Sequence, residues 1–255
     1  MPVIDFEVDG HVAVITINRP EARNAVNGDV ASGIEEAIDR LEGDDSLWLG
    51  ILTGVPPVFC AGADLKEINA GNAGALNTKR GGFAGITSRE RTKPIIAAVD
   101  GPALAGGTEI CLSCDLIVAS TTAKFGIPEV KRCLVAAGGG LFRLPRKIPF
   151  NIAMELTLTG DPIDAERAHH FGLVNYVTEP GQALERAKEL ARQIEANAPV
   201  AVRASRRVVL AAAQEDEATG WQLSGAAFAE AISSEDSKEG LMAFIEKRPP
   251  NWVGK

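Results

Sequence analysis

The sequence lacks three features that would each assign a chain to a class of protein: a long basic run, an apolar run of membrane-spanning length and a disulfide framework. Acidic residues outnumber lysine and arginine by 34 to 26, so the formal charge is −8. This balance argues against nucleic acid as a partner. It leaves room for an anionic small ligand, which needs only a few local cations.

No apolar run reaches about 18 residues, the length that a membrane-spanning helix needs. The first ten residues, MPVIDFEVDG, lack the basic and apolar stretches of a secretory signal. We therefore expect no membrane association and a cytoplasmic location. Hydrophobic residues make up 45% of the chain, enough for the core of one large domain, alone or with an appendage.

The cysteines are few and badly placed for a metal or redox site. Cys111 and Cys114 have C-x-x-C spacing, but no second such pair exists and the three histidines are distant in sequence. The pair lies inside an apolar segment rather than at a helix start, where a redox pair would be expected. We interpret both as small core residues and predict no metal site.

The most informative stretch is residues 94–129. Ile95–Val99 has the β-branched and alanine-rich composition of a buried strand, and Gly106-Gly107 then opens an apolar helix. A glycine turn into a helix N-terminus presents free N–H groups and the positive end of the helix dipole. Glu109 lies within one turn of those amides, and Glu129 begins another expected helix. The combination suits a reaction that builds negative charge on a carbonyl oxygen while protons move.

Strands and helices alternate over the first two thirds of the chain, which predicts an α/β fold with largely parallel strands. We expect a hairpin around Asp9-Gly10, a helix over 28–42, a strand over 49–53, a mobile loop over 69–82 and a short helical passage over 85–91. From about residue 196 the pattern is wholly helical. We therefore divide the chain into a core, 1–195, and a C-terminal helical region, 196–255, whose apolar face suggests subunit packing.

Three motifs in order resemble the enoyl-CoA hydratase/isomerase, or crotonase, superfamily: FCAGADLKE (59–67), GPALAGGTEICLSCD (101–115) and FGIPEV (125–130). The similarity extends from NRPEARNAVN near the N-terminus to EGLMAFIEKRPPNW at the C-terminus. The resemblance implies a spiral of ββα units with a C-terminal helical trimerisation region. It also implies assembly as a homotrimer or a dimer of trimers.

The resemblance further implies hydration of a 2-enoyl-CoA thioester to a 3-hydroxyacyl-CoA without a cofactor, acyl-CoA being the substrate. The N–H groups of Ala63 and Gly106 would form the oxyanion hole. Glu109 would take a proton from the attacking water, and Glu129 would deliver one to the α-carbon. A carboxyl group can act as an acid near neutral pH where its site is dry or close to a like charge.

The remaining residues that the resemblance implies are contacts to coenzyme A. The small residues at 61–63 let the backbone approach a ligand closely. Phosphates would be met by cations, and Lys247 would reach the ligand of a neighbouring subunit. The full set is Arg23, Ala61, Ala63, Asp64, Leu65, Lys66, Gly106 and Lys247.

Simpler structural roles stand beside these assignments. Asp64 is as suited to capping the next helix as to touching substrate. Glu109 and Glu129 could be ordinary acids in the first turns of helices, and the cations could be solvated surface residues. The register of both glutamates after a double-glycine turn favours the catalytic assignment.

The chain also departs from the family pattern. Thr108 stands where many hydratases have a third glycine, and a hydroxyl there could tune or crowd Glu109. The run CLVAAGGG (133–140) replaces a more usual proline and glycine approach, and Cys133 is a candidate for the acyl pocket.

GGFAGIT (81–87), with EDSKEG and FIEKR near the C-terminus, resembles the carnitinyl-CoA dehydratase branch, which handles a cationic acyl group. Carnitinyl-CoA dehydration and enoyl-CoA isomerisation are therefore alternatives within the family. Outside enzymes, the alternatives are a non-catalytic acyl-CoA-binding member and an α/β protein that binds another anion.

Overall fold

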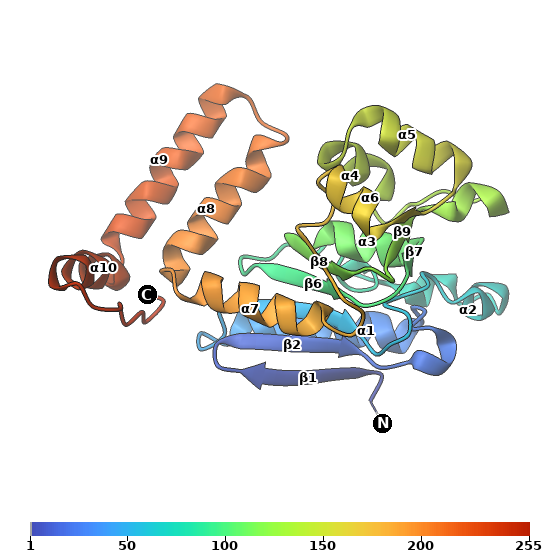
Figure 1. Cartoon of the computed structure of the whole chain (residues 1–255), viewed down its shortest axis with the longest axis horizontal. Helices are drawn as coiled ribbons and strands as arrows, with labels where there is room; N and C mark the ends of the chain where they lie inside the picture. Colours follow the sequence, from blue (N-terminus) through green and yellow to red (C-terminus); the bar gives the residue numbers. More distant parts are fainter. Residues whose placement is uncertain (1) are drawn as a thin grey trace.

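A six-stranded sheet forms the framework of the computed structural model, which describes residues 2–255 (Figure 1). The strand order is β1-β2-β3-β6-β8-β11, in which only the β1–β2 pair is antiparallel. Its strands are β1 (Ile4–Asp9), β2 (Val12–Ile17), β3 (Leu49–Gly54), β6 (Ile95–Val99), β8 (Leu116–Ser120) and β11 (Tyr176–Thr178). The predicted N-terminal hairpin and the predicted parallel pairing are both confirmed.

Smaller strands and the helices complete the described part of the chain. A three-stranded sheet and a short hairpin contain β7 (Ala103–Leu104), β9 (Lys124–Gly126), β10 (Ile163–Asp164), β4 (Asn77–Thr78) and β5 (Gly82–Phe83). The α-helices are α1 (Gly28–Gly43), α2 (Leu65–Asn69), α3 (Gly106–Ser113), α4 (Gly140–Lys147), α5 (Phe150–Thr159), α6 (Ala165–His170), α7 (Ala183–Glu195), α8 (Pro199–Ala212), α9 (Glu217–Ser233) and α10 (Glu235–Glu246). The 3-10 helices are η1 (Pro20–Ala22), η2 (Ala73–Leu76) and η3 (Pro128–Arg132).

The main sheet is covered on both faces, which explains why its central strands are almost continuously apolar. Every residue of β3 and β6 is buried. Alternate side chains go to opposite faces. Ile15 and Leu52 pack in the cluster that contains α1, whereas Val12 and Ile51 pack in the cluster that contains α7. The sheet therefore holds a rigid edge from which the loops of the site extend.

Several local predictions need correction. The expected helical passage over 85–91 is a series of turns, because Ala84 and Gly85 have positive φ angles of 55° and 69°, which no α-helix contains. The expected loop over 69–82 carries η2 and the β4–β5 hairpin. Glu129 lies in the 3-10 helix η3 rather than in an α-helix.

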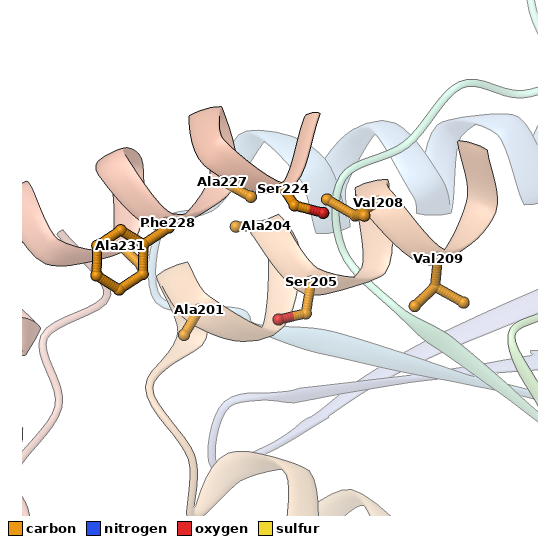
Figure 2. A pocket seen from close by; sticks show the side chains of 9 residues that line it. All are labelled: Ala201, Ala204, Ser205, Val208, Val209, Ser224, Ala227, Phe228 and Ala231. Carbon is orange, nitrogen blue, oxygen red and sulfur yellow. The ribbon is translucent and has the colours of Figure 1, made fainter. Parts of the chain in front are cut away.

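The C-terminal region is helical from α8 onward, as predicted. Figure 1 shows α8 and α9 as an antiparallel pair that stands away from the sheet. The helix α10 lies at the end of the pair where α8 begins and α9 ends. Small residues line the groove between the two helices together with Val208, Val209 and Phe228, and Figure 2 shows Ala204 of α8 directed toward Ala227 of α9. Large apolar residues are exposed here, including Val209 (71%), Trp221 (73%) and Phe244 (85%).

The last residues return to the base of this region. The buried Asp236 carboxylate accepts the N–H groups of Val253 and Gly254 at 2.7 and 3.0 Å. Trp252 donates from Nε1 to the carbonyl of Ala196 at 2.9 Å. Among residues 2–255, no helix combines the length and apolarity that crossing a membrane requires.

Thr108 joins three segments beneath the start of α3. Its Oγ1 is fully buried, lies 2.7 Å from the Ala103 carbonyl oxygen and accepts the N–H of Gly126 at 2.9 Å. The hydroxyl therefore links α3 to β7 and β9. The departure from glycine at this position serves the fold, because these contacts are with backbone groups and not with Glu109.

We predict that Thr108→Val lowers the free energy of unfolding by about 1–3 kcal/mol, because the buried N–H of Gly126 loses its acceptor. Thr108→Ser keeps the hydroxyl and should cost about 0.8 kcal/mol, the contribution of one buried methyl group. Urea unfolding of both variants measures the difference. Equal stabilities for the two variants would contradict the linking role.

Candidate active site

The catalytic residues expected from sequence meet in one cleft of about 530 Å³. Its walls come from the loop after β3, the start of α3, the η2–β5 segment and the residues around η3. The described residues that line it are Arg23, Ala61, Ala63, Leu65, Ile68, Ala73, Leu76, Asn77, Phe83, Leu104, Ala105, Gly106, Glu109, Pro128, Glu129, Arg132, Leu134, Val135, Ala137 and Gly138. Ala63, Gly106, Glu109 and Glu129 are all among them.

Two backbone turns abut at the predicted oxyanion hole. Gly62 has a φ of 93°, and a Cβ there would lie only 3.0 Å from the Gly106 nitrogen and 2.8 Å from the Ala105 Cβ. Within residues 2–255, the N–H groups of Ala63 and Gly106 donate to no acceptor. The arrangement leaves two neighbouring amides free to bind a developing oxyanion.

Helix α3 begins without a side-chain cap. Its N-cap residue, Ala105, has φ 53° and ψ −126°, a conformation that few residues other than glycine adopt. The Ala105 N–H donates to the Gly126 carbonyl at 2.9 Å, which holds this turn against β9. The positive end of the α3 dipole therefore faces the cleft with its amides uncapped.

Glu109 projects from the first turn of α3 into the cleft and is 4% exposed. Its Oε1 accepts the N–H of Gly140 at 2.9 Å, so it does not cap its own helix. Burial raises the pKa of this carboxyl, and the N–H groups of Gly140 and Gly138 and the charge of Arg143 oppose the rise. A Cβ on Gly138 would lie 2.8 Å from Glu109 Oε2, so the glycine turn is shaped around this carboxylate.

Glu129 occupies the first turn of η3, directly after Pro128. Its Oε2 is buried and has no hydrogen-bond partner within residues 2–255. Burial is the main cause that raises its pKa, and the nearby charge of Glu109 raises it further. A buried carboxyl oxygen without a partner is costly to a fold and is typical of a functional group.

The predicted coenzyme A contacts divide into two groups. Arg23, Ala61 and Leu65 line the cleft together with Ala63 and Gly106. Lys66 is an exposed residue of α2, and Lys247 lies at the end of α10, which Figure 1 shows far from α2. Neither Lys66 nor Lys247 is among the described residues of the cleft wall.

Asp64 caps the helix α2, the structural role that the sequence analysis set beside substrate contact. Its Oδ1 accepts the N–H of Lys66 at 2.9 Å, and its Oδ2 pairs with Arg19 Nη1 at 2.7 Å. The hydrogen bond from Arg19 is the largest cause that lowers the pKa of this carboxyl. The side chain thus fixes the entry to α2 and leaves the cleft wall to Ala63 and Leu65.

The cysteines agree with the interpretation as core residues. Cys60, Cys111 and Cys114 are buried, and burial raises the pKa of Cys60 and of Cys114 to about 12. Cys133, the candidate for the acyl pocket, is exposed and is not among the cleft residues.

Several cleft residues were not identified from sequence, chiefly Phe83, Arg132, Leu134 and Val135. Phe83 reaches the site through the unexpected β4–β5 hairpin and lies against Gly106, where a Cβ would approach its ring to 2.4 Å. Leu134 and Val135 belong to the run 133–140 that departs from the family pattern, and Arg132 directly precedes that run.

Comparison with known proteins identifies the family. The sequence profile described as "Enoyl-CoA hydratase/isomerase" matches residues 7–255. The enoyl-CoA hydratase EchA19 of Mycobacterium tuberculosis is 42% identical over 96% of this chain and 94% of its own. A carnitinyl-CoA dehydratase of Proteus mirabilis is 37% identical over 96% of each chain.

A crystal structure titled as an enoyl-CoA hydratase from Mycobacterium tuberculosis H37Rv superimposes with a TM-score of 0.96, at 49% identity and with 100% of both chains covered. The fold is therefore the crotonase spiral that the sequence motifs implied. From residue 7 to the C-terminus, this chain belongs to the enoyl-CoA hydratase/isomerase family.

Proposed function

We propose that the protein is a hydro-lyase that adds water reversibly across the double bond of a 2-enoyl-CoA thioester. The observation that carries the proposal is the meeting of two uncapped amides with two carboxyl groups of raised pKa, the buried Glu109 and the half-buried Glu129, in one cleft. Relatives named as hydratases support the same reaction class.

In the proposed mechanism the thioester oxygen accepts the N–H groups of Ala63 and Gly106. These donors stabilise the enolate-like charge that develops as water attacks, and each such donor is typically worth about 3–4 kcal/mol of barrier. The α3 dipole acts on the same oxygen. This activation needs no cofactor, and acyl-CoA is the substrate.

The glutamates divide the proton transfers. Glu109, fixed through the Gly140 N–H, takes a proton from the water that attacks the β-carbon. Glu129 delivers a proton to the α-carbon from its unpartnered carboxyl, and its raised pKa keeps that proton bound to a higher pH than an exposed glutamate would. Isomerisation would need only one shuttling carboxyl, so the presence of two favours hydration.

The cationic substrate of the carnitinyl-CoA branch fits less well. Among the described residues that line the cleft, the charged ones other than the two glutamates are Arg23 and Arg132. A trimethylammonium group would find no spare carboxylate there.

Glu129→Gln should lower kcat for crotonyl-CoA by at least ~100-fold with little change in KM, because the variant loses a proton donor and keeps its shape. The measurement is the loss of enoyl-thioester ultraviolet absorbance. Glu166→Gln, an exposed position on α6, serves as the matched control. Unchanged turnover in Glu129→Gln would remove this residue from the mechanism, and ligand binding without turnover in the parent would indicate a non-catalytic member.

The variant Glu129→Gln should also be more stable than the parent at pH 8. A carboxyl whose pKa is raised in the folded state binds its proton more tightly there than in the unfolded chain, so stability falls as pH rises above the ordinary value of 4.5. Glutamine removes that charge. We expect Glu129→Gln to raise Tm by roughly 2–4 °C at pH 8, with the gain shrinking toward pH 4. A lower Tm at pH 8 would contradict the cost of ionisation.

We also propose that the region 196–255 joins copies of the chain into a trimer or a dimer of trimers. The large apolar side chains that α8, α9 and α10 expose support this. The parent should scatter light as a particle of three or six times 26.8 kDa, and Phe244→Lys should shift it toward the monomer. Lys238→Ala, also on α10, is the control. A monomeric parent at micromolar concentration would contradict the proposal.

A further inference from the structure

The cleft contains two arginines, Arg23 and Arg132, and each lies near a different catalytic group. Arg23 accepts the N–H of Ala61 with its carbonyl at 3.1 Å, which places it beside the loop that carries Ala63. Arg132 ends η3, the 3-10 helix that carries Glu129. One cation therefore lies on the oxyanion-hole side and the other on the proton-donor side.

Arg132 is an exposed residue of the cleft lining and precedes apolar residues that would contact the acyl group. The chain curls back after η3, where the N–H of Leu134 donates to the Glu129 carbonyl at 3.1 Å. Leu134 and Val135, 48% and 65% exposed, follow along the same cleft. An acyl chain that extends from the two glutamates along these residues passes the Arg132 guanidinium.

This exposed guanidinium makes no hydrogen bond or close ion pair within residues 2–255, although its charge lowers the pKa of the Glu129 carboxyl. Its neighbour Lys131 has one, because it pairs with Asp161 outside the cleft. An unpaired guanidinium beside an apolar wall favours a planar anion that it can bind through two parallel hydrogen bonds, which a carboxylate provides.

We propose that Arg132 selects acyl groups that end in a carboxylate, so that the preferred substrates are 2-enoyl-CoA thioesters of dicarboxylic acids. The inference rests on the proposed hydratase function and names its substrate class. The terminal carboxylate must be several bonds from the double bond, because Glu109 and Glu129 would repel a charge placed between them. Arg132 then offsets the negative charge of the glutamate pair at the far end of the chain.

The experiment compares two substrates that differ only at the end of the chain: 2-hexenoyl-CoA and 2-hexenedioyl-CoA. The parent should have a kcat/KM about 10–100-fold higher for the dicarboxylic substrate, as expected for a hydrogen bond to a charged group. Arg132→Met should bring the ratio of the two kcat/KM values to about one, and this ratio is the readout because Arg132 also acts electrostatically on Glu129. Lys131→Met removes a cation next in sequence and should keep the preference.

A binding measurement separates this inference from the hydration itself. Calorimetry with the saturated thioesters adipoyl-CoA and hexanoyl-CoA should show the same preference in the parent and its loss in Arg132→Met. Turnover of 2-hexenoyl-CoA with no preference in either assay would overturn the inference and leave the hydratase function standing. An equal loss of affinity for both thioesters in Arg132→Met would also overturn it, since the arginine would then bind coenzyme A.

Discussion

The structure depends on keeping the Glu109 carboxyl and one carboxyl oxygen of Glu129 out of water beside a pair of unused amides. Desolvation of an ionisable group opposes folding, so the surrounding chain must hold Glu109 and Glu129 in place. The holding atoms are mostly main-chain atoms: Gly140 donates to Glu109, and Gly138 leaves room for it. Glu129 is held instead by the short helix that carries it.

The rest of the fold supplies the rigidity that this arrangement needs. The buried parallel strands β3 and β6 fix the starting points of the two loops that carry Ala63 and Gly106. Thr108 then ties the first turn of α3 to β7 and β9, and Asp64 ties the other loop to Arg19. Polar side chains that could have been read as ligands thus act on the backbone that carries the donors.

Sequence reasoning predicted those parts whose structure is decided locally. The apolar run Ile95–Val99 and the glycine pair before α3 carry their own signals, and Glu109 follows at a fixed spacing. It failed where tertiary contacts decide. The turn at Ala84 and Gly85 is pressed against α1, where a Cβ on Gly85 would lie 2.2 Å from the Ala31 carbonyl, and no helix signal could reveal that. The position of Arg132 in the cleft wall likewise depends on how the chain folds back after η3.

The oxyanion donors and the N–H group that holds Glu109 all belong to the main chain. A backbone N–H is supplied by every residue except proline, so side chains at the non-glycine positions around the cleft can be exchanged without losing the oxyanion donors or the anchor of Glu109. Residues 133–137 can therefore change while Gly138 and Gly140 still hold the Glu109 carboxylate. The main-chain donors are therefore retained wherever the fold is retained. Substitutions in the wall beside the acyl group can then change which substrates bind.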